Sequence, residues 1–321
     1  MTNQPETSII RPSHWADFTG QPQVVKSLQI AIQAAKSRQE PMEHTLLYGP
    51  PGLGKTTLAH IIANEMGVSL KVTSGPALTR AGDLASILTA LEPGDVLFID
   101  EIHRLNKPVE EALYPAMEDF AIDIILGKGP AAKNLRLDLN PFTLIGATTQ
   151  AGKISSPLRD RFGIVHRLRF YEPEEIKGII LKAAKKLKLK LDEDSALEIA
   201  KRSRGTARIA LKLLRRIRDF NLVEHDSKSN LEITKKSLEF YEVDNEGLDA
   251  TDRHILLAII DQHGGGPVGL ETLAAIISES VETISDLYEP YLMQSGFLSK
   301  TSRGRVATDK AYQHLGKTKK D

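Results

Sequence analysis

The octet at residues 49–56 contains the residue types that grip a chain of phosphates. It reads Gly-Pro-Pro-Gly-Leu-Gly-Lys-Thr and fits the pattern G-x-x-x-x-G-K-[ST]. Its glycines let the backbone wrap an anion with N–H groups pointing inward, and the positive end of the following helix adds to the attraction. Lys55 can then reach the β- and γ-phosphates, and Thr56 can ligate Mg²⁺. A plain turn between a strand and a helix is the structural alternative.

Two adjacent acids, Asp100 and Glu101, follow the apolar run at residues 96–99. The run predicts a buried strand, and ligands of open α/β sheets bind where such strands end. Asp100 is placed to hold Mg²⁺ through water. Glu101 is placed to orient or deprotonate the attacking water, because hydrolysis needs a positioned nucleophile. Capping of the next helix is the alternative for this pair.

Further hydroxyl and guanidinium groups follow along the chain. Thr148 and Thr149 end an apolar run, so either hydroxyl could contact the γ-phosphate if that strand neighbours the one bearing Asp100, although threonine here is also a common turn residue. Arg161, in a short segment with a second arginine and an acid, suits a guanidinium presented to a phosphate across a subunit boundary. A salt-bridged surface helix is the alternative. Arg208, at a helix start, leaves the same two readings open.

The elements that must position these groups follow from the hydrophobic pattern. Short apolar runs alternate with helical patterns up to Tyr171, which predicts an α/β fold with a parallel sheet covered by helices on both faces. The strands are expected at residues 45–48, 70–73, 96–99 and 142–147. We expect this large ATPase domain to span residues 1–171.

Two smaller domains are predicted beyond Tyr171. Helical periodicity with many Lys and Arg residues indicates a small helical domain over residues 172–243, which the family resemblance described below makes the lid. A head domain over residues 244–321 shows three helical patterns and two short strands, which suggests a winged helix. The expected helices are 176–187, 194–202, 208–220, 252–262, 270–277 and 281–293, and the expected wing strands are 297–300 and 305–307.

Composition limits the class of protein. The 321 residues exceed the size of a single core and 41% of them are hydrophobic, so two or three domains are expected. The 42 basic residues balance 42 acidic ones, so any nucleic-acid contact must come from a local cluster. The absence of cysteine excludes disulfides and thiolate metal sites. With no apolar signal segment and no run long enough to span a bilayer, we expect a soluble cytoplasmic protein.

These motifs, in this order, resemble the AAA+ ATPases and, within them, the RuvB family of bacterial Holliday-junction branch-migration motors. The resemblance covers nearly the whole chain. The phosphate loop and the acid pair are general to AAA+ proteins, whereas three other runs are specific to the family: Ile102-His103-Arg104-Leu105, Tyr114-Pro115-Ala116-Met117-Glu118-Asp119 and Gly264-Gly265-Gly266-Pro267. Further matches are Ile10-Arg11-Pro12, Phe18-Thr19-Gly20-Gln21, the run 48–57, Gly146-Ala147-Thr148-Thr149 and the segment 156–163.

The resemblance implies roles for individual residues in binding ATP and Mg²⁺. It implies an adenine pocket lined by Ile10, Arg11 and Tyr171. It implies phosphate contacts from Gly52, Leu53, Gly54, Lys55, Thr56 and Thr57, with Thr56 on Mg²⁺. It also implies that Thr148 is the phosphate sensor, that Arg161 is the arginine finger for a neighbouring subunit, and that Arg208 is the second sensor.

The family also implies assembly and partners. It implies a homohexameric ring that threads double-stranded DNA at Holliday junctions and works with the junction-recognising protein RuvA and the resolvase RuvC. Three positions depart from the family pattern. Gln150 replaces an arginine, Ala207 replaces a proline, and Val281 stands where a DNA-contacting arginine is usual.

A basic cluster near the carboxyl end predicts the DNA contact. Between residues 299 and 320 there are seven basic residues and one acid. Arg303 and Arg305 flank Gly304 in the expected wing, so both should project toward a phosphate backbone and bind it without sequence preference. Lys300 aligns with the first wing arginine of the family. A solvated basic tail is the alternative.

The stretch 120–139 reads as a hairpin, with strands at 122–126 and 135–139 around a Gly-Lys-Gly-Pro break. ATP chemistry does not need such a ribbon. In the family it docks RuvA, so Ile124, Ile125 and Leu126 are the expected partner contacts. An ordinary covered sheet edge is the alternative.

Three rival functions share part of the pattern. A clamp-loading or initiator ATPase has the same fold and would bind a defined duplex or remodel a protein without moving a junction. A metabolic P-loop kinase leaves the helical middle domain and the wing unexplained. A non-enzymatic DNA-binding regulator accounts only for the last domain and predicts no ATP turnover.

Overall fold

The computed structural model describes residues 10–126, 133–225 and 229–319. The chain forms two compact units by its internal contacts. The first contains residues 10–49 and 53–169, and the second contains residues 50–52 and 170–319. Among the described helices, none has the length and apolar character required to cross a membrane.

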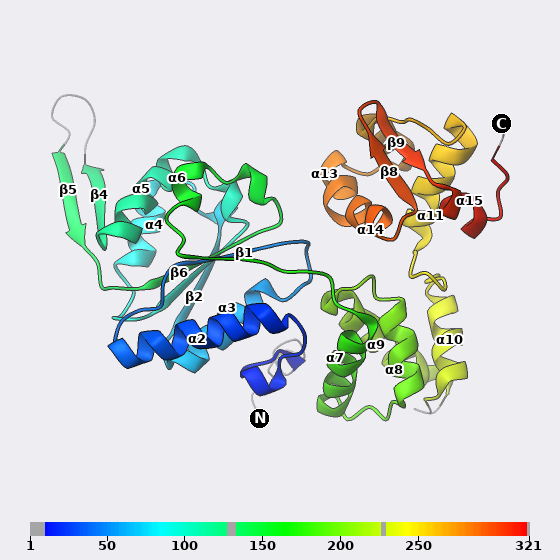
Figure 1. Cartoon of the computed structure of the whole chain (residues 1–321), viewed down its shortest axis with the longest axis horizontal. Coiled ribbons are helices and arrows are strands. Elements are labelled where there is room, and N and C mark those ends of the chain that lie inside the picture. Colours follow the sequence, from blue (N-terminus) through cyan, green and yellow to red (C-terminus); the bar gives the residue numbers. More distant parts are fainter. Residues whose placement is uncertain (1–9, 127–132, 226–228, 320–321) are drawn as a thin grey trace. The chain divides into compact units, whose positions relative to one another are not determined.

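A five-stranded parallel sheet forms the centre of the first unit, with strand order β2-β3-β6-β1-β7 (Figure 1). Four of its strands lie where the sequence predicts them, and β7 was not predicted because its short run Ile-Val-His-Arg is half polar. In the sheet β6 lies between β1 and β3, and its last residue, Thr148, is the register partner of Tyr48. The strands are β1 (Thr45–Tyr48), β2 (Leu70–Ser74), β3 (Val96–Asp100), β6 (Thr143–Thr148) and β7 (Ile164–Arg167).

Helices cover both faces of this sheet, as the α/β pattern predicts. In Figure 1, α2 and α3 lie along one face, and α4 and α5 lie on the other. The phosphate-loop helix α3 begins directly after Gly54 and ends at Met66, where the left-handed backbone of Gly67 caps it. The helices are α2 (Pro22–Arg38), α3 (Lys55–Met66), α4 (Ala81–Leu88), α5 (Lys107–Glu118) and α6 (Ser156–Arg159), with 3₁₀ turns η1 (Trp15–Asp17), η2 (Gly75–Ala77), η3 (Ile102–Arg104) and η5 (Ala151–Lys153).

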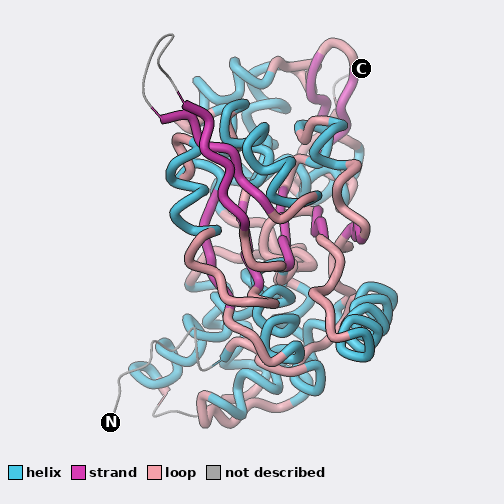
Figure 2. The backbone as a smooth tube through the Cα atoms, turned by 90° about the vertical axis from the view of Figure 1, so that its left-hand side faces the viewer, coloured by secondary structure: helices cyan, strands magenta, loops and turns pink. Residues whose placement is uncertain are grey.

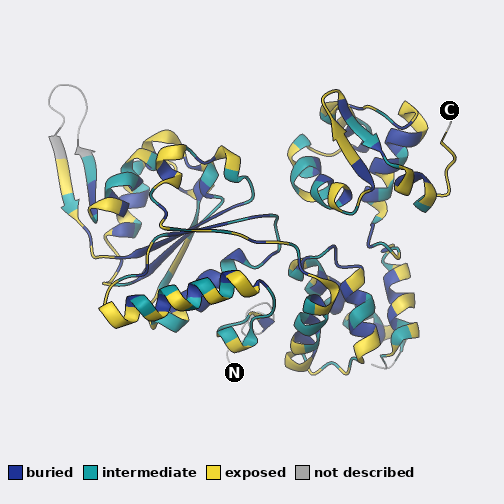
Figure 3. Ribbon diagram, in the orientation of Figure 1, coloured by how far each residue is buried: buried dark blue, intermediate teal, exposed yellow. Residues whose placement is uncertain are grey.

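The β3 strand is buried on both faces, which is why its sequence is continuously apolar. Leu97 and Ile99 belong to the core cluster that includes Leu84 of α4 and Leu113 of α5. Phe98 points to the opposite face because successive side chains of a strand alternate, and it is also fully buried. Figure 3 shows the central part of the sheet in the colour of buried residues. The strand therefore holds its last residues at a fixed point of the sheet edge.

An antiparallel hairpin leaves the first unit between α5 and β6. It consists of β4 (Ala121–Leu126) and β5 (Lys133–Asp138). The register pairs Ile122 with Leu137 and Ile124 with Leu135. Figure 2 shows the two strands side by side along most of their length. The predicted hairpin is present, with β5 beginning two residues earlier than the pattern suggests.

The second unit begins with a bundle of four amphipathic helices, the predicted lid. Their polar first residues explain where they start, because Asp192, Thr206 and Asn230 each accept a backbone N–H of the next turn. A fully buried apolar stripe includes Ile176, Ile199 and other residues of these helices. The helices are α7 (Pro173–Lys186), α8 (Glu193–Lys201), α9 (Ala207–Glu224) and α10 (Leu231–Phe240).

The predicted winged helix follows, packed around the fully buried Phe297. The helix predicted over 281–293 is divided by a π-helical turn, and Pro290, which has no N–H to donate, lies in the first turn of the part beyond it. The elements are α11 (Ala250–Leu257), π-turn η6 (Ala258–Gln262), α12 (Leu270–Ile277), α13 (Val281–Thr283), π-turn η7 (Ile284–Tyr288), α14 (Glu289–Gln294), β8 (Leu298–Thr301), β9 (Gly304–Ala307) and α15 (Asp309–His314).

The β2–β3 register offers a matched test of this core. Phe98 and Val72 are register partners, but Phe98 is fully buried and Val72 is 55% exposed. We expect Phe98→Ala to lower the free energy of unfolding by about 3–5 kcal/mol, because it leaves a cavity. Val72→Ala should cost no more than about 1 kcal/mol, the range of strand propensity. Urea unfolding followed by circular dichroism measures both, and equal costs would contradict the arrangement.

Candidate functional site

The phosphate loop connects β1 to α3 and is shaped by its glycines. Gly49 has φ of 142°, and a Cβ there would lie 2.6 Å from the carbonyl oxygen of Leu168. Gly52 has φ of 82°, and a Cβ there would lie 2.9 Å from the Cβ of Arg208. Both positions therefore require glycine for space as well as for backbone conformation. The loop has the form that the sequence pattern predicts.

Lys55 and Thr56 begin α3 at the end of this loop. Lys55 is 7% exposed, and its Nζ donates to the carbonyl oxygen of Gly49 at 2.7 Å. That contact folds the ammonium group back over the loop, where the phosphates of a nucleotide would lie. Leu53 is fully buried and anchors the loop, whereas Thr57 follows Thr56 in the first turn of the helix.

Asp100 and Glu101 stand at the carboxyl end of β3, as predicted. The Oδ1 atom of Asp100 accepts the backbone N–H of Glu101 at 3.0 Å. Glu101 itself has a left-handed backbone with φ of 49°, an uncommon conformation for a residue other than glycine. A Cβ on Gly75 would lie 2.4 Å from the carbonyl oxygen of Glu101, so the neighbouring turn packs tightly beneath it. The acid pair therefore has a fixed backbone.

The two threonines that end β6 have different surroundings. Thr148 is fully buried, and its Oγ1 accepts the backbone N–H of Gln150 at 2.9 Å and lies 2.8 Å from Nδ1 of His103. Thr149 is only partly buried, and its Oγ1 donates to Oε2 of Glu101 at 3.3 Å. The resemblance gives the sensor role to Thr148. In the structure, the neighbouring hydroxyl of Thr149 lies next to the Glu101 carboxylate.

The finger candidate Arg161 follows α6 and is held by three groups of its own unit. Its Nη2 lies 3.1 Å from Oε2 of Glu118, its Nη1 donates to the carbonyl oxygen of Pro157 at 2.7 Å, and its guanidinium lies 4.3 Å from the ring centre of Tyr114. Tyr114 and Glu118 belong to the run 114–119 that the sequence singles out without giving it a role. Here that run shapes the surroundings of Arg161.

The residues expected to line the adenine pocket lie in both units. Ile10 is 8% exposed at the start of the described chain. Arg11 is exposed, and its Nη1 donates to Nε2 of His60 at 2.8 Å; burial and the charge of Arg11 both lower the pKa of His60, so the ring accepts as a neutral group. In the second unit Tyr171 is 4% exposed, and its backbone N–H donates to the carbonyl oxygen of Gly205 at 2.9 Å.

Comparison with known proteins identifies the family. A family model described as the Holliday junction DNA helicase RuvB P-loop domain matches residues 10–168, the RuvB AAA lid domain matches residues 171–244, and the RuvB C-terminal winged helix domain matches residues 245–316. The solved structure of the Thermotoga maritima RuvB Holliday junction branch migration motor is 52% identical to this chain, with a TM-score of 0.88, over 97% of this chain and 99% of that one.

The chain belongs to the RuvB family. Two mutant structures of the Thermotoga maritima RuvB are similar to it as well. One is 52% identical with a TM-score of 0.88, over 96% of this chain and 98% of its own. The other is 53% identical with a TM-score of 0.89, over 96% of this chain and 99% of its own.

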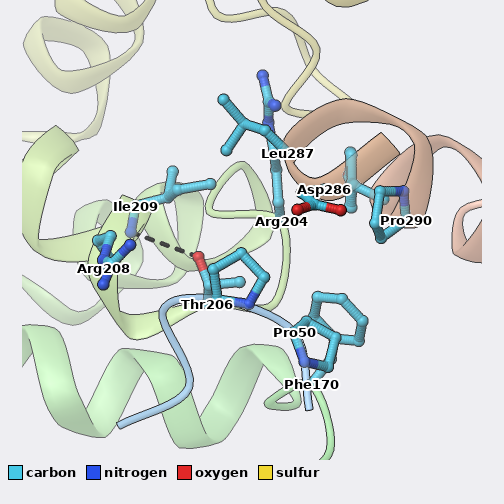
Figure 4. Close-up of a pocket in the computed structure, with 11 residues that line it drawn as sticks. Pro50, Phe170, Arg204, Thr206, Arg208, Ile209, Asp286, Leu287 and Pro290 are labelled. Carbon is cyan, nitrogen blue, oxygen red and sulfur yellow. Dashed lines mark hydrogen bonds between the residues drawn. The ribbon is translucent and has the colours of Figure 1, made fainter. Parts of the chain in front are cut away.

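The RuvB lid in the second unit contacts the tip of the phosphate loop, residues 50–52. The backbone N–H of Arg208 donates to the carbonyl oxygen of Gly52 at 3.3 Å, and the Arg208 side chain is exposed. Figure 4 shows a pocket beside this contact. It is lined by Pro50, Pro51, Phe170, Arg204, Thr206, Arg208, Ile209, Asp286, Leu287, Pro290 and Tyr291.

Arg204, four residues before Arg208, joins the RuvB lid to the winged helix inside the second unit. Its guanidinium forms ion pairs with Asp249 at 2.7 Å and with Asp252, and its Nε donates to the carbonyl oxygen of Gly247 at 2.9 Å. Arg204 is 7% exposed and Asp252 is fully buried. Sequence reasoning did not assign Arg204, because an arginine next to a glycine carries no signal for a partner 45 to 48 residues away.

One guanidinium at this joint faces two carboxylates, so one negative charge is surplus. Arg204 lowers the pKa of Asp249 although burial opposes it. Burial raises the pKa of Asp252 to about 7, with the charge of Asp249 adding to the rise and Arg204 opposing it. Asp252 therefore holds a proton in the folded chain at pH values where an ordinary aspartate is ionised.

The RuvB wing presents two of its three predicted DNA contacts. Lys300 and Arg303 are exposed on the β8–β9 hairpin. The expectation that Arg305 projects with them is wrong, because its Nε and Nη2 donate to the two carboxylate oxygens of Glu289 at 2.8 and 3.0 Å, and its side chain is only 12% exposed. Glu289 is buried, and its carboxylate would be an unpaired charge without this cation. The basic tail is also partly neutralised, since Lys317 binds Asp261.

The RuvB hairpin has an apolar face that is only partly covered. Ile124 packs against the core of the first unit, so only part of its side chain is accessible to a partner protein. Its register partner Leu135 is 41% exposed. The side chains of Ile125 and Leu126 lie outside the described residues. Leu135 was missed as a candidate because the sequence cannot tell how far along this face of the hairpin the core extends.

The surplus carboxylate at the Arg204 joint gives a pH prediction. The folded chain keeps a proton on Asp252 that the unfolded chain releases above the ordinary pKa of 3.8, so raising the pH through this window to about 7 disfavours the folded state. Relative to Asp252→Asn, the wild-type free energy of unfolding should fall by up to about 1.4 kcal/mol per pH unit between those values and level off above.

Urea unfolding at a series of pH values compares the two proteins. Asparagine keeps an oxygen for the backbone N–H of Asp249, which Asp252 accepts at 2.9 Å, so the helix cap is retained in the variant. Parallel pH curves for the two proteins would contradict the assignment of the surplus charge to Asp252.

Proposed function

We propose that this chain is the ATP-driven motor of Holliday-junction branch migration and works on double-stranded DNA as a homohexameric ring in the cytoplasm. In this proposal an ATPase domain at residues 1–171 and a lid at 172–243 bind and cleave ATP, and a head at 244–321 contacts DNA. The observation that carries the proposal is a RuvB match along the whole chain in which the phosphate loop, the acid pair and the wing are all retained.

The proposed chemistry begins with the grip on the triphosphate. Backbone N–H groups from Gly52 to Thr57 and the Nζ of Lys55 hold phosphate oxygens, which neutralises the charge that opposes attack. Glu101 accepts the proton of the attacking water, and the hydroxyl of Thr149 beside it helps to place that water. Thr148, the last residue of β6, is the proposed phosphate sensor.

Magnesium fits the oxygen groups at this site. Thr56 and Asp100 supply a hydroxyl and a carboxylate, the ligand chemistry that Mg²⁺ takes, and Mg²⁺ sites in nucleotide enzymes use few protein ligands because phosphates and waters complete them. When bound, the ion supplies positive charge that polarises the terminal phosphate. Asp100 is held in place by its bond to the backbone N–H of Glu101.

Two arginines and the adenine contacts complete the proposed site. Arg161 acts on the ATP of a neighbouring subunit, and Arg208 is the second sensor in the lid. Ile10, Arg11 and Tyr171 receive the adenine base. A finger supplied by a neighbour makes hydrolysis depend on the ring, so that one subunit's ATP state affects the next.

Force reaches DNA through the head. Lys300 and Arg303 contact the phosphate backbone, which gives binding that depends on salt and not on sequence, as a translocating motor requires. Arg305 shapes the wing in the free protein through its ion pair with Glu289. The hairpin β4–β5 docks RuvA, and RuvC resolves the junction after migration.

Mixing two inactive variants tests the trans assignment of Arg161. Arg161→Ala and Glu101→Gln should each lower ATP turnover by about 10³-fold. An equal mixture should recover up to about a quarter of the wild-type rate, because Glu101→Gln subunits lend Arg161 to neighbours whose own acid pair is intact. Turnover and migration of a synthetic four-way junction with RuvA are measured together. A mixture that forms rings yet stays as inactive as its parts would sink the assignment.

Leu135 tests the docking surface. Leu135→Asp should remove the stimulation of ATP turnover by RuvA and leave basal turnover within about twofold of wild type, because a charge on an exposed apolar contact costs desolvation only in the complex. Ile30→Asp, at a residue of α2 that is 56% exposed, is the matched control. Stimulation that survives Leu135→Asp, or is lost equally in the control, contradicts this surface.

A further inference from the structure

His103 lies close to Glu101 and Thr148, and the proposed chemistry gives it no role. Its Nδ1 lies 3.1 Å from Oε2 of Glu101 and 2.8 Å from Oγ1 of Thr148. The His103 side chain is 6% exposed, and Thr148 is fully buried. Thr149 donates to the same Glu101 oxygen. Two side chains thus lie within reach of Oε2, His103 from η3 and Thr149 just after β6.

The partners of Nδ1 decide where the histidine proton lies. An ionised carboxylate only accepts hydrogen bonds, so a nitrogen 3.1 Å from Oε2 of Glu101 must carry hydrogen to be attracted to it. The tautomer with a proton on Nδ1 therefore suits this site, because that hydrogen can lie between Glu101 and Oγ1 of Thr148. Oγ1 of Thr148 accepts from the Gln150 backbone as well, so this hydroxyl is fixed from two sides.

The same threonine is joined to the phosphate loop. The backbone N–H of Gly49, the first residue of the loop, donates to the carbonyl oxygen of Thr148 at 3.2 Å. A path of two hydrogen bonds and one close N···O contact therefore runs from Gly49 through Thr148 and His103 to Glu101, among buried or half-buried groups. Low exposure strengthens such bonds and keeps water from replacing them.

We propose that His103 is a positioning residue for ATP hydrolysis, which connects Thr148 and the phosphate loop to Glu101 and turns the carboxylate so that Oε1 faces the attacking water. The proposal rests on the role of Glu101 given above. His103 and Thr149 occupy Oε2, and Oε1 takes the water's proton. Without His103 the carboxylate loses its orientation, and the rate of the chemical step depends on that orientation.

Two variants, His103→Leu and His103→Asn, distinguish a positioning role of this side chain from a role in packing alone. Leucine retains bulk and removes the donor. The asparagine amide nitrogen can occupy roughly the place of Nδ1 and donate to Glu101. We expect His103→Leu to lower kcat about 10²-fold, the lower end of what a positioned base contributes, with ATP affinity within about threefold of wild type. His103→Asn should recover to within about tenfold of wild type. His166→Asn, in β7, is the control.

Thr148→Val provides a second variant that preserves shape if His103→Leu does not fold. It should lower kcat in the same way, and the double variant should be no slower than the slower single variant, because both break one path. The measurements are steady-state ATP turnover of the full chain with DNA, and equilibrium binding of a fluorescent ATP analogue.

The outcomes distinguish this inference from the proposed function. Wild-type protein that fails to hydrolyse ATP, or Glu101→Gln that hydrolyses it normally, overturns the proposed function itself. Wild-type turnover that Glu101→Gln abolishes, combined with normal kcat in His103→Leu, overturns only the positioning role. Normal kcat in Thr148→Val would overturn the proposed sensor role of Thr148 as well. Loss of ATP affinity with unchanged kcat also overturns it, as does a leucine variant as active as the asparagine variant.

Discussion

Parallel pairing of β6 with both β1 and β3 is the constraint on which the rest of the site depends. In a parallel sheet all carboxyl ends lie at one edge, so the loop after β1, the acids after β3 and the threonines after β6 meet there although about 50 residues separate each from the next. Hydrogen bonds of the ladder fix the register. A shift of β6 by one residue would turn its side chains to the opposite face and separate Thr148 from His103.

Tight backbone contacts then convert this shared edge into a defined site. Gly49 and Gly75 each leave room for a carbonyl oxygen that a Cβ would strike, one from Leu168 and one from Glu101. The left-handed backbone of Glu101 is tolerated because the turn beneath it is packed. In the proposed mechanism, positioning of the carboxylate is shared between the left-handed backbone of Glu101 and the side chains of His103 and Thr149.

The second unit follows another principle, because its joint is ionic and buried. Arg204 ties the residues just before the lid's second-sensor candidate to the first helix of the winged helix. A buried cation with two carboxylates does little for net stability, but breaking it leaves an unpaired charge, so the arrangement specifies one geometry. Glu289 of α14 and Arg305 of β9 form a second ion pair of low exposure in the winged helix. Both pairs connect segments that carry proposed nucleotide or DNA contacts.

The sequence by itself determined the chemistry and the order of the domains. Phosphate-loop spacing, a continuous apolar strand before two acids and the family-specific runs are local patterns, and local patterns reflect backbone preferences and burial that neighbouring residues impose. The tertiary structure alone decided which side chains meet. It placed Thr149 beside Glu101, bound Arg305 to Glu289, buried one face of Ile124 and joined Arg204 to Asp252. These contacts link residues far apart in the chain, and the identity of a partner across such a distance is set by packing and charge in three dimensions, which no local pattern encodes.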